Sequence, residues 1–462
     1  MKLCVIGTGY VGLVSGACFS ELGHDVMCVD VHEQKIAELK AGRIPIFEPG
    51  LEDLVKSNQA AGRLTFTTEI QDAIADGINV FFITVGTPTA ALDGGANLEY
   101  VFAAVANIAK HAALTRRQNP NQIVFVTKST VPIGTNRTIE EIVGRYIPSD
   151  GFAIASNPEF LREGAAIKDF MRPDRIVIGS SCEKARATLD AVYYPMTSAG
   201  VPLHIVSSVQ TAELVKYAAN AFLATKISFI NEIARLSEAA GANIDEVVAG
   251  VGSDRRIGLD FLSPGPGYGG SCFPKDTQAL VKTAIEFNSP LTIVEAVIAA
   301  NHRHKLMMIA KIREAIGGNL LDKRLSILGL AFKANTDDMR DSPALVIIPG
   351  LMRQGADIVG YDPIAFENAR ALMPDIRIES EIGAAVKDAD GVVILTEWPE
   401  FRDLDLNFLV ADCRGKTVID LRNIVSKDRI TDFKGSYFGL GKPKVSPDPK
   451  TEMELLLGRE VA

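Results

Sequence analysis

The sequence predicts an α/β protein with two doubly wound parallel-sheet domains joined by a long central helical segment. Three observations lead to this fold class. The first 30 residues contain a short apolar strand, a glycine turn, a helix and a second strand. Apolar residues then recur at helical spacing over residues 209–240. The last third alternates strand-like and helix-like stretches again, and such alternation is typical of a parallel sheet covered by helices.

Composition limits the kind of protein. The chain has 462 residues, which at about 150 residues per domain corresponds to roughly three domains. Hydrophobic residues make up 47% and charged residues 23%, as in a globular protein. The net charge of −9 argues against broad electrostatic binding of nucleic acid, although it allows a local basic pocket for a phosphate ligand.

The cysteines and the apolar runs indicate a cytoplasmic protein. Six cysteines are scattered without any CxxC pair, which argues against a disulfide framework and a structural metal site and suits a reducing compartment. The uncharged stretch 3–20 superficially resembles a secretory signal, but four glycines interrupt it. Since no other uncharged apolar run approaches the ~18–20 residues of a membrane span, we expect no membrane association.

The N-terminal motif predicts a dinucleotide site. A buried strand at residues 2–6 leads into a GxGxxG turn, in which Gly7 permits the tight bend, Gly9 allows backbone to approach a pyrophosphate and Gly12 allows close helix packing. The following helix offers its N-terminal N–H groups to phosphates. Asp30, at the end of the second strand, can accept both ribose hydroxyls and disfavours a 2′-phosphate. The motif therefore predicts a Rossmann-like domain that binds NAD rather than NADP.

Further strands are expected at 80–85, 123–127 and 176–178. Polar clusters follow two of them, at 84–88 and at 128–132. Either cluster could be ordinary turn chemistry. Because ligands bind at the carboxyl ends of parallel strands, their common position favours a functional role, with Thr84 and Thr130 as candidates.

The middle of the chain carries the candidate chemistry. Lys216 and Asn220 are four residues apart on the predicted 209–240 helix and share a face, although a solvated lysine and a surface amide are the ordinary alternative. Residues 265–276 (GPGYGGSCFPKD) form a glycine-rich cradle before a helix expected at 277–285. Cys272 would then lie at a helix N-terminus, where the dipole and Lys275 favour a thiolate. The alternative is a buried, inert cysteine.

Charged segments add candidates for ligand contacts. In 157–164 (NPEFLREG), Glu159 and Glu163 would face together if the segment were helical. Arg255 and Arg256 form a plausible phosphate clamp, and Asp276 could simply be an acid that complements its helix dipole. For each segment the alternative is a charged surface turn.

The C-terminal third reads as a second α/β unit. Strands are expected at 324–328, 357–361, 391–395 and 417–421, with a helix at 342–353, and Lys333, Arg340 and Arg422 fall in loops or at strand ends. Without a full GxGxxG motif, this unit is expected to be a nucleotide or substrate lid rather than a second NAD site. The expected division is a 1–205 NAD domain, a 206–318 helical domain, a 319–442 nucleotide-sugar domain and a loose tail at 443–462.

These motifs together resemble the UDP-glucose 6-dehydrogenase family of nucleotide-sugar dehydrogenases. The resemblance covers essentially the whole chain through GTGYVGL, VGTPT, KSTVPIGT, NPEFLREG, the Lys216–Asn220 helix, RRIG, GPGYGGSCFPKD and FKANTDDMRDSP. It implies a UDP-binding C-terminal domain and a central dimerising helix. It also implies oxidation of UDP-glucose at C6 to UDP-glucuronate with two NAD reduced per sugar, in the supply of polysaccharide precursors.

The resemblance also assigns roles. Cys272 would be the nucleophile that carries a thiohemiacetal and then a thioester, and Lys216 would stabilise the oxyanion. Asp276, with a water shared with Thr130, would assist proton transfer, Glu159 would be the base for thioester hydrolysis, and Asn220 would orient the sugar. The expected NAD contacts are Gly7, Gly9, Val11, Gly12, Asp30, Lys35, Thr84, Thr130, Glu163, Lys275 and Arg340. The expected substrate contacts are Glu159, Phe160, Leu161, Arg162, Glu163, Lys216, Asn220, Arg256, Phe261, Leu262, Ser263, Pro264, Gly265, Gly267, Tyr268, Gly269, Lys333 and Arg422.

Some features leave alternatives open. Arg256 would reach a neighbouring subunit's substrate, so a homodimer or higher oligomer is expected. Asn97 and Ser263 depart from residues more common in the family. The same chemistry on GDP-mannose or a UDP-N-acetylhexosamine remains an alternative, as do a two-electron dehydrogenase of a 3-hydroxy acid and a non-catalytic NAD sensor. The presence of Lys216, Cys272 and Asp276 together argues against the last two.

Overall fold

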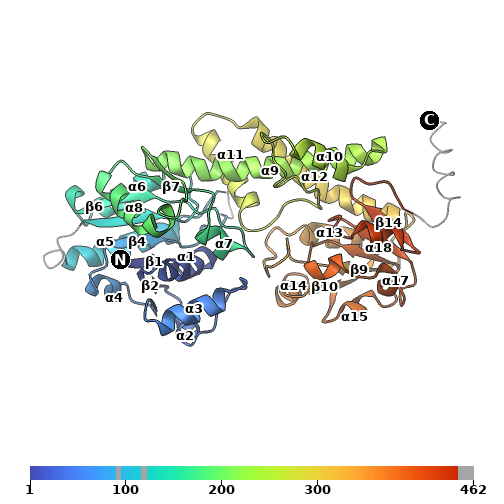
Figure 1. Cartoon of the computed structure of the whole chain (residues 1–462), viewed down its shortest axis with the longest axis horizontal. Coiled ribbons are helices and arrows are strands. Elements are labelled where there is room, and N and C mark those ends of the chain that lie inside the picture. The colour runs from blue at the N-terminus through green and yellow to red at the C-terminus, as the bar shows by residue number, and fades with distance from the viewer. Residues whose placement is uncertain (90–94, 116–121, 446–462) are drawn as a thin grey trace. The chain divides into compact units, whose positions relative to one another are not determined.

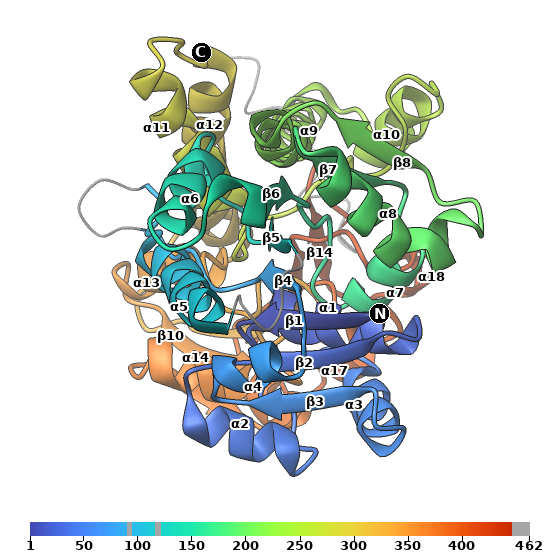
Figure 2. The ribbon, with the colours of Figure 1, turned by 90° about the vertical axis from the view of Figure 1, so that its left-hand side faces the viewer.

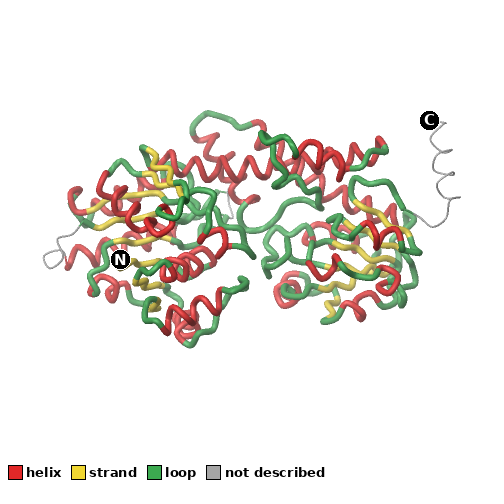
Figure 3. The backbone as a smooth tube through the Cα atoms, in the orientation of Figure 1, coloured by secondary structure: helices red, strands yellow, loops and turns green. Residues whose placement is uncertain are grey.

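The computed structural model describes residues 1–89, 95–115 and 122–445. The chain forms two compact units, each composed of two stretches of sequence: residues 1–220 with 278–290, and residues 221–277 with 291–462. Two helices, α9 (Val209–Ala240) and α11 (Phe273–Glu286), continue from one unit into the other. Helices alternate with strands along both units (Figure 3).

The first unit contains an eight-stranded sheet in the order β3-β2-β1-β4-β5-β6-β7-β8. Its first six positions have the 3-2-1-4-5-6 order of dinucleotide-binding sheets. The pairing is parallel except between β6 and β7, where Ser156 and Gly179 pair antiparallel, which differs from the wholly parallel sheet expected. The strands are β1 (Lys2–Ile6), β2 (Asp25–Val29), β3 (Leu64–Thr67), β4 (Val80–Ile83), β5 (Ile123–Thr127), β6 (Phe152–Ser156), β7 (Ile176–Gly179) and β8 (Leu203–Val206).

Helices cover both faces of this sheet. Because side chains alternate along a strand, β1 sends Leu3 and Val5 into one apolar cluster and Cys4 and Ile6 into another. Figure 2 shows α4, α5 and α6 on one side of the sheet and α1, α7 and α8 on the other. The helices of the unit are α1 (Tyr10–Glu21), α2 (Glu33–Lys40), α3 (Leu51–Ala60), α4 (Ile70–Ala75), α5 (Glu99–Thr115), α6 (Thr135–Gly144), α7 (Ala166–Met171) and α8 (Glu183–Thr197).

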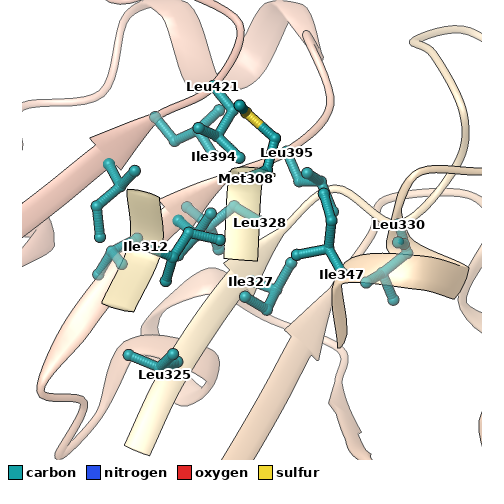
Figure 4. Packing of buried hydrophobic residues seen from close by; sticks show 14 of the residues in the cluster. Met308, Ile312, Leu325, Ile327, Leu328, Leu330, Ile347, Ile394, Leu395 and Leu421 are labelled. Atoms are coloured by element: carbon teal, nitrogen blue, oxygen red, sulfur yellow. The ribbon is translucent and has the colours of Figure 1, made fainter. Parts of the chain in front are cut away.

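The second unit contains a six-stranded parallel sheet in the order β11-β10-β9-β12-β13-β14. Met308 and Ile312 of α12 (Thr292–Ala315) pack in one cluster with Leu325 and Ile327 of the central strand (Figure 4). The strands are β9 (Arg324–Leu328), β10 (Asp357–Tyr361), β11 (Arg377–Glu379), β12 (Gly391–Ile394), β13 (Thr417–Asp420) and β14 (Ser436–Gly439). The helices are α10 (Ile244–Gly252), α12, α13 (Ala344–Met352), α14 (Phe366–Leu372), α15 (Ile382–Val386), α16 (Pro399–Arg402), α17 (Leu406–Leu409) and α18 (Lys427–Thr431), seen in Figure 1.

Two local expectations need correction. The helix after the glycine cradle starts at Phe273, not Thr277, because the Asp276 amide already donates to the Cys272 carbonyl over 2.8 Å. The segment 157–164 is not helical, so Glu159 and Glu163 do not share a helix face. The residue before a proline disfavours the helical region, and Asn157 precedes Pro158.

The predicted helix at 209–240 coincides with α9. Most of the tail expected to be loose lies outside the described residues. The division into three domains and a tail stays a prediction. Among the described helices, none is long and apolar enough to cross a membrane.

Candidate active site

The glycine turn of the first unit leaves its outer surface clear. Gly7 has φ +95°, and its amide donates to Val29 O over 2.7 Å, which ties the turn to β2. A Cβ at Gly12 would collide with the Gly7 carbonyl, whereas a Cβ at Gly9 would meet no described atom within 4 Å. The Thr84 hydroxyl donates to the carbonyls of Ile6 and Gly7, so Thr84 stabilises the turn through its main chain. Backbone at Gly9 can therefore be approached by a pyrophosphate, as the motif predicts.

Asp30 is held as a carboxylate beside this turn. Its oxygens accept from the Thr8 amide at 2.8 Å, the Thr8 hydroxyl at 2.7 Å and the His32 amide at 3.1 Å, and Lys35 Nζ lies 3.2 Å away. Burial opposes the charged form, but these hydrogen bonds and the Lys35 ammonium outweigh it and lower the pKa of Asp30. The structure thus brings Asp30 and Lys35 together at the end of β2. An ionised acceptor at this position fits the ribose hydroxyls of NAD.

Lys216 is buried, so the interpretation of a solvated lysine is wrong. Its ammonium lies 3.0 Å from a carboxylate oxygen of Glu159, and both side chains are 4% exposed. The other Glu159 oxygen accepts from the Leu161 amide at 2.5 Å. Lys216 Nζ also lies 5.3 Å from the centre of the Phe160 ring. Asn220, one turn further along α9, is buried as well.

A second buried lysine lies near this pair and was missed in the sequence. Lys128 follows β5, and its ammonium donates to Asn157 Oδ1 at 3.1 Å and to the Tyr193 hydroxyl at 3.2 Å. Burial lowers the pKa of Lys128 to about 8, with a raising influence from Glu159 and a lowering one from Lys216. Lys128 stands in the 128–132 cluster, but no pattern in the residue types indicated that its side chain would be buried.

Two acidic side chains, Asp169 and Glu48, bind the rest of the segment 159–164. Arg162, an expected substrate contact, pairs with Asp169 at 2.7 Å. Glu48, which sequence reasoning also missed, accepts from the amides of Gly164 at 2.6 Å and Ala166 at 2.8 Å, and from the Tyr10 hydroxyl. Glu48 therefore fixes the turn that carries Glu163.

Cys272 immediately precedes α11 and is partly exposed. Its sulfur lies 3.5 Å from the Ser271 hydroxyl. Cys18 and Cys28 are by contrast buried, and their burial raises the pKa of each thiol to about 12. Lys275 and the buried Asp276 form an ion pair of 2.7 Å in the first turn of α11. Because Cys272 is partly exposed, the alternative of a buried, inert cysteine is wrong. Its position at a helix N-terminus favours a thiolate.

The expected substrate loop and one expected cation meet within the second unit. Arg422 donates to Phe332 O at 2.8 Å and Leu395 O at 2.9 Å, and pairs with Glu397 at 3.0 Å. A Cβ at Gly265 would lie 3.1 Å from Arg422 Nη1, so the loop and the guanidinium are neighbours. Lys333 Nζ lies 5.5 Å from the centre of the Phe332 ring. These contacts place Lys333 and Arg422 on the side of the unit that carries the loop.

Two expected cations are more exposed. Arg340 pairs with Asp338 at 2.7 Å, and Arg256 pairs with Asp254 at 2.6 Å while remaining 89% exposed. Neither is fixed by deep burial. Within the described parts of the chain, no group of His, Cys, Asp and Glu side chains could hold a metal ion.

The acid after β10 occupies the position that Asp30 has after β2. Asp362 accepts from the Leu330 amide at 2.7 Å, the Ala331 amide at 3.0 Å and Trp398 Nε1 at 3.2 Å. The Trp398 indole lies beside Asp362 as a donor that has no counterpart at Asp30. This arrangement fits the expectation that the second unit binds a different nucleotide.

Comparison with known proteins gives full-length matches. Residues 1–197, 210–303 and 326–427 match the NAD binding, central and UDP binding domains of the UDP-glucose/GDP-mannose dehydrogenase family. A UDP-glucose 6-dehydrogenase of Rhizobium meliloti (strain 1021) is 50% identical over 96% of this chain and 100% of that protein. One of Bacillus subtilis (strain 168) is 44% identical over 96% and 94%.

Solved structures agree with these matches. A UDP-glucose dehydrogenase from Pyrobaculum islandicum has a TM-score of 0.86 at 38% identity and covers 96% of this chain and 98% of its own. A UDP-D-ManNAc dehydrogenase from Pyrococcus horikoshii has a TM-score of 0.82 at 26% identity, with 96% and 99% covered. The similarity thus extends over both compact units.

Proposed function

Because this chain belongs to the UDP-glucose/GDP-mannose dehydrogenase family, we propose that it oxidises C6 of UDP-glucose to the carboxylate of UDP-glucuronate. One observation carries the proposal: Cys272 is a partly exposed thiol immediately before the N-terminus of α11. A cysteine in this setting is suited to covalent capture of an aldehyde. The relatives at 50% and 44% identity act on UDP-glucose by name, which favours this substrate over GDP-mannose.

The cofactor is NAD, and the first unit would hold it through Gly7, Gly9, Gly12 and Asp30. NAD, when bound, accepts a hydride from the same sugar carbon at each of two oxidation steps. The clear surface at Gly9 and the ionised Asp30 fit the pyrophosphate and the ribose. We assign Val11, Lys35, Thr84, Thr130, Glu163, Lys275 and Arg340 as further residues of the cofactor site.

Cys272 supplies the covalent chemistry. Its thiolate adds to the carbon of the aldehyde left by the first oxidation, and the proton that the oxygen gains completes a thiohemiacetal. The second oxidation turns this adduct into a thioester. Water then cleaves the carbon–sulfur bond, which releases the carboxylate and restores the thiol. The sequence consumes one water and explains how a single carbon loses four electrons without release of the aldehyde.

The surrounding residues stabilise charge and move protons. We propose that Lys216 stabilises the oxyanion and that Asn220 orients the sugar, both from buried positions on α9. Asp276, with a water shared with Thr130, would take the alcohol proton, and Glu159 would activate the hydrolytic water. The pairing of Glu159 with Lys216 at 3.0 Å, with both side chains buried, supports a linked role.

We assign the contacts of the nucleotide sugar in the second unit to the loop 261–269, Lys333 and Arg422, of which Gly265 and Arg422 are neighbours. In the first unit we assign them to residues 159–163. Arg162 would have to leave Asp169 to take part.

We further propose a homodimer formed through α9. Phe222, Phe229 and Leu236 recur every seven residues on this helix and are all exposed, so they form an apolar stripe. Such a stripe fits a second copy of the same helix. The exposed Arg256 would then reach a neighbouring subunit's substrate. Phe229→Glu is expected to halve the mass measured by light scattering, and an unchanged mass would contradict the dimer.

The proposed location is the cytoplasm. All six cysteines lie in described residues and form no disulfide, which suits a reducing compartment.

The deciding experiment is the NADH yield from limiting UDP-glucose with excess NAD. Two NADH per sugar are expected from the four-electron oxidation. A yield of one would mean that the reaction stops at the aldehyde, and Cys272 would then have no covalent role. With no NADH at all, the nucleotide sugar would be wrong, and GDP-mannose and UDP-N-acetylhexosamines would be tested in the same assay.

A further inference from the structure

A polar face of α12 is buried against the glycine-rich loop. Asn301, His304 and Lys305 follow the three- and four-residue spacing of one helix face, and all three are buried. Each binds main-chain atoms of another segment rather than a side chain of its own helix. Buried polar side chains that form hydrogen bonds with main-chain groups of a distant segment fix the position of that segment.

Both main-chain groups of Gly265 are bound by side chains. Its amide donates to Asn231 Oδ1 of α9 at 2.9 Å, and its carbonyl lies 2.7 Å from His304 Nε2. Tyr268 is bound in the same way, because Asn301 Oδ1 accepts from its amide at 2.9 Å and Asn301 Nδ2 donates to its carbonyl at 3.1 Å. The loop is thus held at Gly265 by side chains of α9 and α12 and at Tyr268 by a side chain of α12.

The contacts of His304 identify its tautomer. Nδ1 lies 2.8 Å from Nη1 of Arg235, which can only donate, so Nδ1 is the acceptor and the proton resides on Nε2. Burial lowers the pKa of His304 to about 4, since the Arg235 charge acts in the same direction and the hydrogen bond to Gly265 only partly opposes it. At neutral pH the ring is therefore a neutral donor aimed at the Gly265 carbonyl.

The loop has little room to shift. Gly267 has φ +118°, and a Cβ there would lie 2.9 Å from both Asn301 Oδ1 and Lys305 Cγ. A Cβ at Gly265 would lie 3.1 Å from Arg422 Nη1. Lys305 Nζ donates to the Asp341 carbonyl at 2.9 Å, and Gly270 N donates to the Arg340 carbonyl at 2.8 Å. The loop backbone is therefore packed between α12 and Arg422.

We infer that His304 and Asn301 are positioning residues that hold the main chain of 265–268 in the shape that binds a nucleoside diphosphate beside Arg422. The inference rests on the proposed function, because it concerns how that substrate loop is formed. Neither residue needs to touch the ligand. Their effect reaches it through the loop, so it should appear in nucleotide affinity and KM rather than in the chemical step.

The test is calorimetric titration of the full chain with UDP, together with steady-state kinetics. His304→Leu removes the donor to Gly265 and the acceptor for Arg235, and we expect UDP binding to weaken about 10- to 100-fold. KM for UDP-glucose should rise similarly, while NAD affinity stays within about twofold. His304→Gln, which can donate and accept at matching positions, should restore UDP affinity to within about threefold of wild type. His302→Leu, an exposed histidine on the same helix, is the matched control and should change nothing.

A second variant covers the case in which His304→Leu does not fold. Asn301→Asp has the same shape but loses the donor to the Tyr268 carbonyl, and it should also weaken UDP binding at least tenfold. Folded His304→Leu or Asn301→Asp protein that binds UDP like wild type would overturn the inference alone. The same holds if folded His304→Gln fails to rescue. A wild-type protein that binds no UDP would overturn the proposed function and this inference together.

Discussion

The ammonium of Lys216 lies 3.0 Å from the carboxylate of Glu159, and each side chain is 4% exposed. The two residues come from α9 and from the loop after β6, which are separated by more than 50 residues of sequence. Removal of one partner of a buried ion pair leaves the other without compensation and is strongly destabilising. A buried, fixed cation of this kind suits stabilisation of an oxyanion, because it needs no reorganisation when charge develops.

Glu159→Gln should separate thioester formation from its hydrolysis. The amide cannot act as a base and leaves Lys216 buried without its counter-charge, so we expect loss of about 3 kcal/mol in the free energy of unfolding. Turnover should fall at least about 100-fold, while a rapid first formation of NADH survives. Intact mass spectrometry should then find a UDP-glucuronyl adduct on the protein. Wild-type turnover without an adduct would contradict the role of Glu159 as the base for hydrolysis, and an unchanged free energy of unfolding would contradict its role as the counter-charge of Lys216.

Cys272→Ser tests the covalent step directly. A serine hydroxyl at the start of α11 is not ionised at neutral pH, so it should not capture the aldehyde, and release of UDP-glucuronate should fall at least about 1000-fold. Binding of UDP and NAD should be unchanged. Cys182→Ser, another partly exposed cysteine, serves as the control and should behave as wild type. Free acid released by Cys272→Ser at the wild-type rate would exclude the thioester route.

Asp30→Ala tests the ribose site. The substitution removes the charged acceptor and leaves the Thr8 amide and hydroxyl without their partner, so NAD affinity should fall about 10- to 100-fold. UDP affinity, measured by the same titration, should be unaffected. Asp25→Ala, an exposed acid at the start of the same strand, is the matched control. Unchanged NAD affinity in Asp30→Ala would mean that another residue binds the ribose.

Local patterns predicted the fold, whereas most candidate site residues were assigned through the resemblance to a known family. The strand–turn–helix at residues 2–21 and the helix 209–240 were predictable because their periodicity and glycine spacing depend on near neighbours alone. The start of α11 was predicted too late. The first turn is closed by a hydrogen bond from the Asp276 amide to the Cys272 carbonyl, and a bond between main-chain groups cannot be recognised from the residue types.

The supporting side chains could not be predicted in the same way. Lys128, Glu48 and His304 are polar residues whose burial depends on partners 29 or more positions away: Asn157, Gly164 and Gly265. In a sequence they are indistinguishable from surface residues. The Trp398 partner of Asp362 was also hidden, since only the structure brings the indole to the carboxylate. Contacts between distant segments therefore account for what sequence reasoning missed.

Lys128 should give the stability of the protein a distinct pH dependence. Burial lowers its pKa to about 8 from the ordinary 10.5, so between these values the unfolded chain binds a proton that the folded chain has released. The free energy of unfolding should therefore rise as the pH increases from 8 to 10.5, with a contribution of at most about 1.4 kcal/mol per pH unit from this residue.

Lys128→Met should remove that contribution while the Tyr193 hydroxyl still donates to Asn157 Oδ1 at 2.5 Å. The measurement is urea unfolding of both proteins at several pH values between 7 and 10.5. Lys305, whose pKa burial also lowers to about 8, acts equally in both proteins, so the difference in slope reports on Lys128. Lys56→Met, which alters an exposed lysine, should leave the slope as in wild type. Equal slopes in wild type and Lys128→Met would mean that Lys128 retains an ordinary pKa in the folded protein.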